Sequence, residues 1–242
     1  MAQNNQNGLL SRRRFLQGSA GLGGGLALAS FAGAFGMGTA EAAHTNDDPQ
    51  TILNLAATAE ALAVTFYYSA VTGAQFSVNA DDVEYLKAAM DAEQYHYEFL
   101  TGAGGKALTT QFYVPATVLS DPNVFIKTGL AAETAFVAAY LAATRTFADA
   151  GLGKLAATTA QHAASEAVHL SLVREIAGYL PNDLAVPAAI YYNVSDAVPT
   201  LAPFLKGGSG FIGPVSMPSA DKVKAAMGDL KTGRPPMFVS LY

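Results

Sequence analysis

Two stretches, Glu93-Gln94-Tyr95-His96 and Glu166-Ala167-Val168-His169, share the pattern Glu-x-x-His and decide how the rest of the 242-residue chain is interpreted. A glutamate precedes each stretch by 33 positions: Glu60 precedes the first, and Glu133 precedes the second. A single shift of 73 positions carries the first set of residues onto the second. The chain therefore contains two copies of one unit, and each copy offers two carboxylates and one imidazole.

Apolar residues recur three and four positions apart around each of the four glutamates, which predicts four amphipathic helices. The first runs from about residue 49 to 71, and the second begins after Asn79, a favourable N-cap, and ends at the glycines of 102–105. The third begins at Asp121-Pro122, and the fourth follows the glycine turn at 151–153 and ends before Gly178. Because the two glutamates of each antiparallel hairpin are equidistant from its turn, we expect them at the same height.

A connection of about 17 residues, from about 104 to 120, joins the two hairpins and has no helical period. When extended it reaches over ~50 Å, which exceeds the ~36 Å length of a 24-residue helix. It can therefore cross the whole bundle. We predict an all-α, ferritin-like four-helix bundle with one long crossover over residues 43–180.

Residues 181–242 differ from the bundle in composition, since they hold eight of the 11 prolines. They are too apolar for a disordered linker. We expect an irregular, Pro-rich C-terminal extension that packs on the bundle or mediates assembly, with one short helix near residues 219–227.

The N-terminal residues 1–42 are interpreted as an export signal. The stretch 11–17 (Ser-Arg-Arg-Arg-Phe-Leu-Gln) resembles a twin-arginine signal, a Gly/Ala-rich apolar run follows, and residues 40–42 (Ala-Glu-Ala) match a small-x-small cleavage site. This predicts passage through the twin-arginine export machinery and a periplasmic or extracellular location. An uncleaved membrane anchor is the less favoured alternative, because the run is rich in glycine.

Charge and cysteine content exclude several classes of protein. Removal of residues 1–42 takes away three arginines and one glutamate and moves the formal net charge from −5 to −7, so nucleic acid is not an expected partner. There are no cysteines, which excludes disulfides and thiolate ligands. We expect no membrane-spanning segment after the signal, because the most apolar run, 130–141, contains Glu133.

A metal site explains why glutamates interrupt four apolar helix faces, since an ionised carboxylate without a partner should not be buried. Residues i and i+3 share a helix face, so each Glu-x-x-His pair can bind one ion. Four carboxylates balance two divalent cations, and the mixture of oxygen and imidazole donors suits iron or manganese. The alternative is that these residues lie on solvent-exposed helix faces by chance, and the apolar residues around them argue against it. The predicted metal ligands are Glu60, Glu93, His96, Glu133, Glu166 and His169.

This set resembles the ligands of the ferritin-like superfamily over about residues 50–180, and an exported, Ala-rich chain with a Pro-rich tail is similar to bacterial ferritin-like and desiccation-related proteins. The resemblance implies that one glutamate from each hairpin bridges two metals and that each histidine binds one. Tyr67 and Tyr140, also 73 positions apart, could donate hydrogen bonds or relay electrons, although an ordinary core role is favoured. His162, one turn before Glu166, fits a supporting position beside the metals or a satisfied helical histidine equally well.

Two functional hypotheses follow. The leading one is an exported di-metal protein that handles dioxygen or peroxide, or oxidises Fe(II), in stress protection, as a ferroxidase or a manganese-catalase-like oxidoreductase. The alternative is a structural, desiccation-protective protein whose metal site is stabilising or vestigial. Iron and manganese both fit the ligand set. A homo-oligomer is compatible with the tail, whereas an iron-storage cage is less favoured because acidic clusters for nucleation are missing from the sequence.

Overall fold

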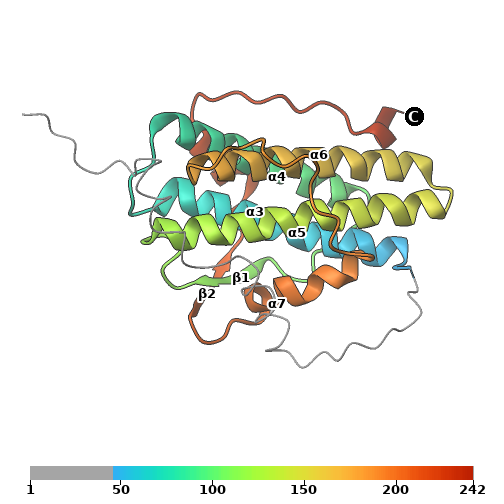
Figure 1. The fold of residues 1–242 in the computed structure, drawn as a ribbon, viewed down its shortest axis with the longest axis horizontal. Coiled ribbons are helices and arrows are strands. Elements are labelled where there is room, and N and C mark those ends of the chain that lie inside the picture. Colours follow the sequence, from blue (N-terminus) through green and yellow to red (C-terminus); the bar gives the residue numbers. More distant parts are fainter. Residues whose placement is uncertain (1–45, 242) are drawn as a thin grey trace, which may run out of the picture.

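Four long helices form the centre of the structure (Figure 1), which is a computed structural model that describes residues 46–241. They are α3 (Pro49–Gly73), α4 (Ala80–Gly102), α5 (Pro122–Asp149) and α6 (Gly153–Ile176). α3 packs along α4, and α5 packs along α6, as two hairpins. The all-α bundle predicted from the sequence is confirmed, while the signal assigned to residues 1–42 lies outside the described residues.

The helices begin where side chains can bind the free N–H groups of the first turn. Asp48 accepts a hydrogen bond from Thr51 N at 3.0 Å and caps α3, ahead of Pro49 at the first helical position. Asn79 caps α4, and Asp121 caps α5. α6 begins at the predicted glycine turn without a side-chain cap, and Gly151 there has a positive φ of 72°, which favours glycine.

The crossover runs beside α3 from one end of the bundle to the other. Near its start, Lys106 N donates to Asn54 Oδ1 at 2.8 Å, early in α3. At its end, Gln75 N, just beyond α3, donates to Leu119 O at 2.7 Å. α5 therefore begins at the same end of the bundle as α4, which gives the parallel arrangement of these two helices that the predicted long crossover requires.

The C-terminal extension contains more regular structure than the sequence indicates. Its elements are η1 (Val194–Ala197), α7 (Val198–Lys206), β2 (Phe211–Ser216), α8 (Ala220–Met227) and η2 (Phe238–Leu241). The predicted short helix corresponds to α8, which Ser219 caps. β2 pairs antiparallel with β1 (Gln111–Pro115) in the crossover, with Phe112 opposite Val215. The extension thus holds the crossover as well as the bundle.

The last part of the chain, residues 231–241, is called here the C-terminal strap. It lies across α4 and α6, the two helices that carry the Glu-x-x-His stretches, as the red segment above them in Figure 1 shows. Arg234 Nη2 binds Asp91 Oδ1 on α4 at 2.5 Å. Farther along, Val239 N donates to Thr158 Oγ1 on α6 at 2.9 Å.

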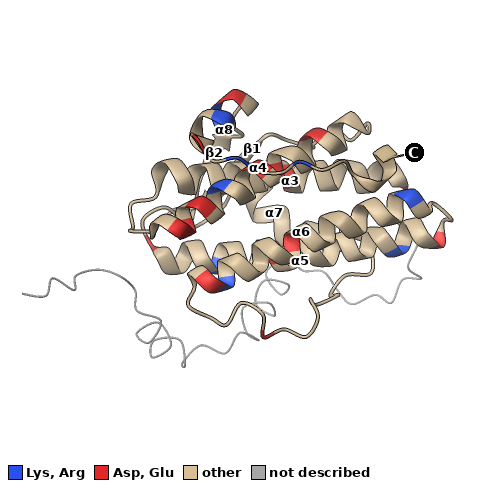
Figure 2. Ribbon diagram, turned by 90° about the horizontal axis from the view of Figure 1, so that it is seen from above, with Lys and Arg blue, Asp and Glu red and all other residues tan. Residues whose placement is uncertain are grey.

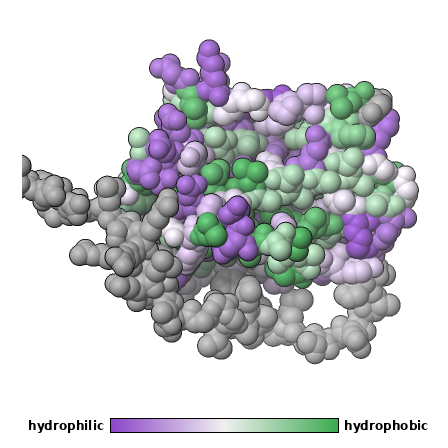
Figure 3. All heavy atoms as spheres, turned by 45° about the horizontal axis from the view of Figure 1, so that its top comes forward, coloured by the Kyte–Doolittle hydropathy of each residue, from purple (hydrophilic) through white to green (hydrophobic). Residues whose placement is uncertain are grey.

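Charged residues are sparse along the bundle helices (Figure 2), and apolar patches lie between polar ones on the face drawn in Figure 3. By length and composition α5 could cross a membrane, contrary to the expectation that no later segment could. Half of its most apolar window is buried inside the bundle, and a helix at the core of a protein has the same composition.

Candidate metal centre

The six residues that the sequence singles out meet inside the bundle. Two come from single positions on α3 and α5, and four come from the Glu-x-x-His stretches of α4 and α6. No member of the set is more than 5% exposed. Burial of four carboxylates at one place costs a large desolvation free energy unless cations or protons compensate them.

Their donor atoms form two overlapping groups, and within each group all atoms lie within 4.8 Å of one another. The first group contains Glu60 and His96, and the second contains Glu133 and His169. Glu93 and Glu166 belong to both groups. The arrangement repeats the internal duplication of the sequence, because a shift of 73 positions exchanges one group for the other.

Each histidine turns Nδ1 toward several carboxylates. His96 Nδ1 lies 3.1 Å from Glu93 Oε2, 3.1 Å from Glu166 Oε1 and 3.5 Å from Glu60 Oε2. His169 Nδ1 lies 2.8 Å from Glu93 Oε1 and 3.2 Å from Glu166 Oε2. One Nδ1 carries at most one hydrogen, so a single imidazole cannot satisfy all of these oxygens.

One oxygen of each of the four glutamates is buried and has no hydrogen bond of good geometry within the described part of the chain, although a histidine nitrogen lies near some of them. Donor atoms that converge on one point without satisfying one another are suited to a positive ion. Carboxylate oxygens with one imidazole nitrogen in each group match the donors that iron and manganese accept. The residues present therefore fit a pair of divalent metal ions.

The two tyrosines bind the glutamates of the opposite hairpin. Tyr67 on α3 donates a hydrogen bond to Glu133 on α5, and Tyr140 on α5 donates one to Glu60 on α3. Both rings are buried, at 1% and 4% exposure, in keeping with the core role that the sequence favoured. Their hydroxyl groups also donate hydrogen bonds, which was the alternative role considered from the sequence. The sequence did not predict that each bond joins one hairpin to the other.

Burial and mutual repulsion move the pKa values of the site. Burial, with the negative charges of Glu93 and Glu166, raises the pKa of Glu60 well above its ordinary value, and the pKa of Glu133 rises for the same reasons. Burial alone would lower the pKa of His96 and His169, but the surrounding carboxylates outweigh it and raise both. Without metal, the cluster therefore compensates its carboxylates by holding protons.

Glu93 differs in pKa from Glu60 and Glu133. Burial alone would raise its pKa, but the charge of His169 and hydrogen bonds from both histidines outweigh burial and hold its pKa well below the ordinary value. Glu93 therefore stays ionised more readily than Glu60 or Glu133.

His162 lies beside the six residues and contributes to neither group. Its Nδ1 is 2.9 Å from Thr158 O, its ring stacks on Tyr140 with a centroid distance of 4.8 Å, and His96 lies at 4.7 Å. Burial and the charge of His96 lower the pKa of His162 to about 4, so the ring is neutral at pH 7. Nε2 has no hydrogen-bond partner within the described residues. The ring thus touches the site, and the reading as a fully satisfied helical histidine does not hold.

The fold and the site define a helical-bundle protein whose buried glutamates and histidines could hold metal ions. The chain belongs to the ferritin-like family: the family model described as a ferritin-like domain matches residues 48–179, more than half of the chain. The match spans the four bundle helices and all six candidate ligands. Searches of curated proteins and of solved structures find no significant match to this chain.

Proposed function

We propose that the protein binds two divalent metal ions at this centre, iron or manganese, with Glu93 and Glu166 shared between them. Glu60 and His96 complete the ligands of one ion, and Glu133 and His169 complete those of the other. The observation that carries this assignment is the overlap of the two groups of donor atoms at exactly these two glutamates. Two carboxylates shared in this way would hold both ions among the same six buried side chains.

The centre is proposed to act as an oxidoreductase on dioxygen or peroxide, or in the oxidation of Fe(II). A pair of iron or manganese ions supplies two-electron redox chemistry when bound. The protein supplies an enclosed site, since its six ligands are almost completely buried. Tyr67 and Tyr140 orient the two unshared glutamates. Burial, together with the charge of the glutamate that each binds, raises the pKa of both tyrosines well above the ordinary value, so both keep their protons as they donate.

The first test is elemental analysis of the mature protein purified from its native export pathway. About two equivalents of iron or manganese per chain are expected, because four carboxylates balance two divalent ions. Rates of Fe(II) oxidation and peroxide consumption would then be measured for the wild type and for Glu93→Gln and Glu166→Gln. Unchanged rates in both variants would overturn the enzymatic role.

A structural metal site is the competing function, and the low exposure of all six ligands favours it. A protective protein of this kind, for example one that acts during desiccation, needs no path for substrate. Metal removal would then lower the melting temperature while the loaded protein shows no turnover. Turnover that depends on the metal would favour the enzyme.

Export through the twin-arginine machinery and a role in stress protection outside the cytoplasm belong to the same proposal. The support is the sequence of residues 11–17 with its paired arginines. Replacement of Arg12 and Arg13 by lysine keeps the charge but removes the arginine pair. Cell fractionation should then find the variant retained in the cytoplasm, whereas unchanged export would exclude this route. Gel filtration of the mature protein tests the proposed homo-oligomer.

A further inference from the structure

A small apolar cavity lies between the bundle and the C-terminal extension, next to one end of the candidate metal centre. Its walls come from α3, α5 and the η1–α7 segment, and they are apolar almost throughout. Ile52, Ala139 and Ala143 lie in these walls, and so does the ring of Tyr140. Because the Tyr140 hydroxyl binds Glu60, this one side chain connects the cavity with the Glu60–His96 group.

The cavity is large enough for one small molecule. The space open to the centre of a water-sized sphere is about 20 Å³, above the roughly 10–15 Å³ that a single water needs. A water molecule also needs two to four polar partners, which these walls do not provide, so the lining favours an apolar guest over water. The guest that fits is therefore small and apolar.

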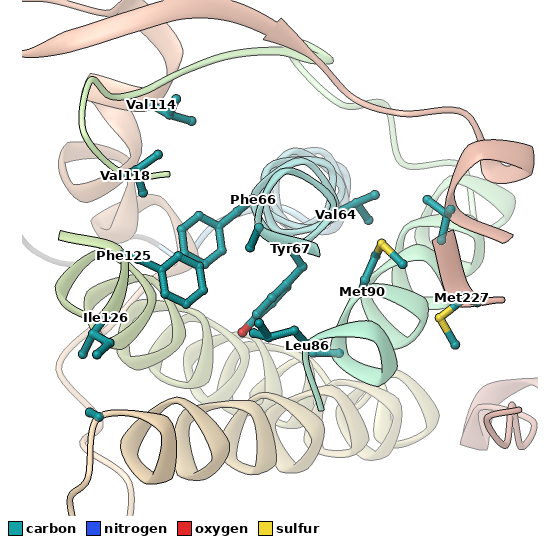
Figure 4. Close-up of a cluster of buried hydrophobic side chains, with 14 residues drawn as sticks. Val64, Phe66, Tyr67, Leu86, Met90, Val114, Val118, Phe125, Ile126 and Met227 are labelled. Atoms are coloured by element: carbon teal, nitrogen blue, oxygen red, sulfur yellow. The ribbon is translucent and has the colours of Figure 1, made fainter. Parts of the chain in front are cut away.

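The internal duplication shows that the cavity is not a general property of the bundle. The shift of 73 positions relates Ala139 to Phe66 and Ile52 to Phe125. At that second end the two phenylalanine rings stack in parallel with centroids 4.9 Å apart (Figure 4), at the positions that Ala139 and Ile52 hold at the first end. Phe66 and Phe125 belong to a continuous buried cluster with Tyr67. Large aromatic rings therefore occupy these two positions at one end of the duplicated bundle, whereas smaller side chains line the cavity at the other end.

We infer that this cavity binds dioxygen next to Tyr140 and directs it to the Glu60–His96 side of the metal centre. The inference rests on the proposed function and narrows it. Dioxygen is apolar and diatomic and matches the walls. Peroxide donates and accepts hydrogen bonds and would lose them there. The cavity therefore favours dioxygen over peroxide as the substrate class.

The test uses the full chain supplied with zinc, which has no redox chemistry and does not consume dioxygen. Dissolved dioxygen is paramagnetic, so it speeds the NMR relaxation of methyl protons that it approaches. Ala143 lines the cavity, and its duplicate Ala70 lies in the cluster that contains Phe66 and Phe125. Ala143 is 1% exposed and Ala70 is 5% exposed. Access from solvent alone would therefore favour Ala70, whereas a dioxygen site predicts a several-fold larger enhancement at Ala143.

Two variants test the inference, one by filling the cavity and the other by removing an aromatic ring at the opposite end. Ala139→Phe introduces the residue that the duplicate uses and should reduce the enhancement at Ala143 to the level of Ala70. Phe66→Ala removes the ring at the opposite end and should increase the enhancement at Ala70. Equal enhancements at Ala143 and Ala70 in the wild type would overturn the inference, and this comparison needs no variant to fold.

Activity gives a second, separable readout. With iron supplied, Ala139→Phe should raise the KM for dioxygen in Fe(II) oxidation and leave kcat unchanged; an unchanged KM would count against the cavity as a route. The relaxation measurement is independent of turnover. A clear difference between Ala143 and Ala70 supports the dioxygen site even if the protein proves to have no oxidase activity, and equal values refute it even in an active enzyme.

Discussion

Tyr140 on α5 donates its hydroxyl hydrogen bond to Glu60 on α3, across the boundary between the two hairpins. The duplicate bond joins Tyr67 on α3 to Glu133 on α5. Each hairpin therefore fixes a carboxylate of the other. The position of these two glutamates depends on how the hairpins pack together, so the shape of the centre is a property of the assembled bundle.

Tyr140→Phe should weaken metal binding in the half of the centre that contains Glu60. Loss of a hydrogen bond that orients a ligand costs about 10–100-fold in metal affinity. Anaerobic titration with Fe(II) or Mn(II), followed by calorimetry, should show one weakened site and one unchanged site. Tyr67→Phe should give the same pattern at the Glu133 half. Tyr68→Phe, next to Tyr67 on α3, is the control. Equal weakening of metal binding in all three variants would contradict the assignment.

Variants of a shared and of an unshared glutamate should retain different numbers of metal ions per chain. Glu60→Gln removes a ligand from one group only, so the purified variant should retain about one metal ion per chain. Glu93→Gln removes a ligand from both groups and should lose most of both ions. Elemental analysis measures the number of metal ions per chain, and circular dichroism verifies that each variant keeps its helical fold. A Glu93→Gln variant that retains two ions would show that this carboxylate is not shared.

Metal affinity should increase with pH. The pKa values of Glu60, Glu133, His96 and His169 are raised, so these groups hold protons in the metal-free protein at pH values where free side chains would release them. Ligands must lose their protons to bind metal. The affinity should therefore change by about tenfold per pH unit for each proton displaced.

Calorimetry of metal binding in two buffers with different ionisation enthalpies counts those protons. Release of protons on metal binding is expected near neutral pH, because the pKa values of both histidines are raised. Binding without proton release, or an affinity that does not change between pH 6 and 8, would mean that the cluster is ionised before metal arrives.

Arg234→Ala should release the C-terminal strap with little effect on global stability. Burial alone would raise the pKa of Asp91, but hydrogen bonds from Arg234 and Thr232 outweigh it and hold the pKa below the usual range. This contribution is present above the ordinary pKa of an aspartate and is lost as pH falls through the lowered value. A partly exposed ion pair contributes roughly 0.2–1 kcal/mol, so the melting temperature should fall by at most about 2–4 °C.

Hydrogen exchange is the measurement that detects release of the strap. Amides of residues 231–241 should lose protection at pH 7 in Arg234→Ala, while amides in the middle of α4 and α6 keep theirs. Lys231→Ala, in the same segment, is the matched control. Equal protection in the wild type and Arg234→Ala would show that contacts such as Val239 with Thr158 hold the strap without the ion pair.

The sequence predicts the bundle because local signals and the internal repeat agree. Asp48, Asn79 and Asp121 cap their helices as such residues should. The constant shift of 73 positions identifies which polar residues on the apolar faces belong together. Helical spacing then places Glu93 and His96 on one face, and the distance of 3.1 Å between His96 Nδ1 and Glu93 Oε2 agrees with that placement.

The extension is less predictable because its contacts join residues far apart in the sequence. β1 is five residues long, and its partner β2 lies about a hundred positions later, so neither strand has a local signal beyond a few β-branched and aromatic residues. α7 contains Pro203, which argues against a helix in a sequence-based reading. The partner of Arg234 was equally hidden, since nothing in the sequence near Asp91 indicates an arginine from the tail.

The pairing of β1 with β2 has a consequence for the order in which the protein matures. Phe112 is completely buried and lies opposite Val215, in a cluster that includes Leu201. The ribosome finishes the four bundle helices before it makes β2, and domains tend to fold from the N-terminal side during synthesis. In a nascent bundle the apolar surface around Phe112 therefore stays exposed until the last quarter of the chain has been synthesised. During that interval a chaperone can bind this surface.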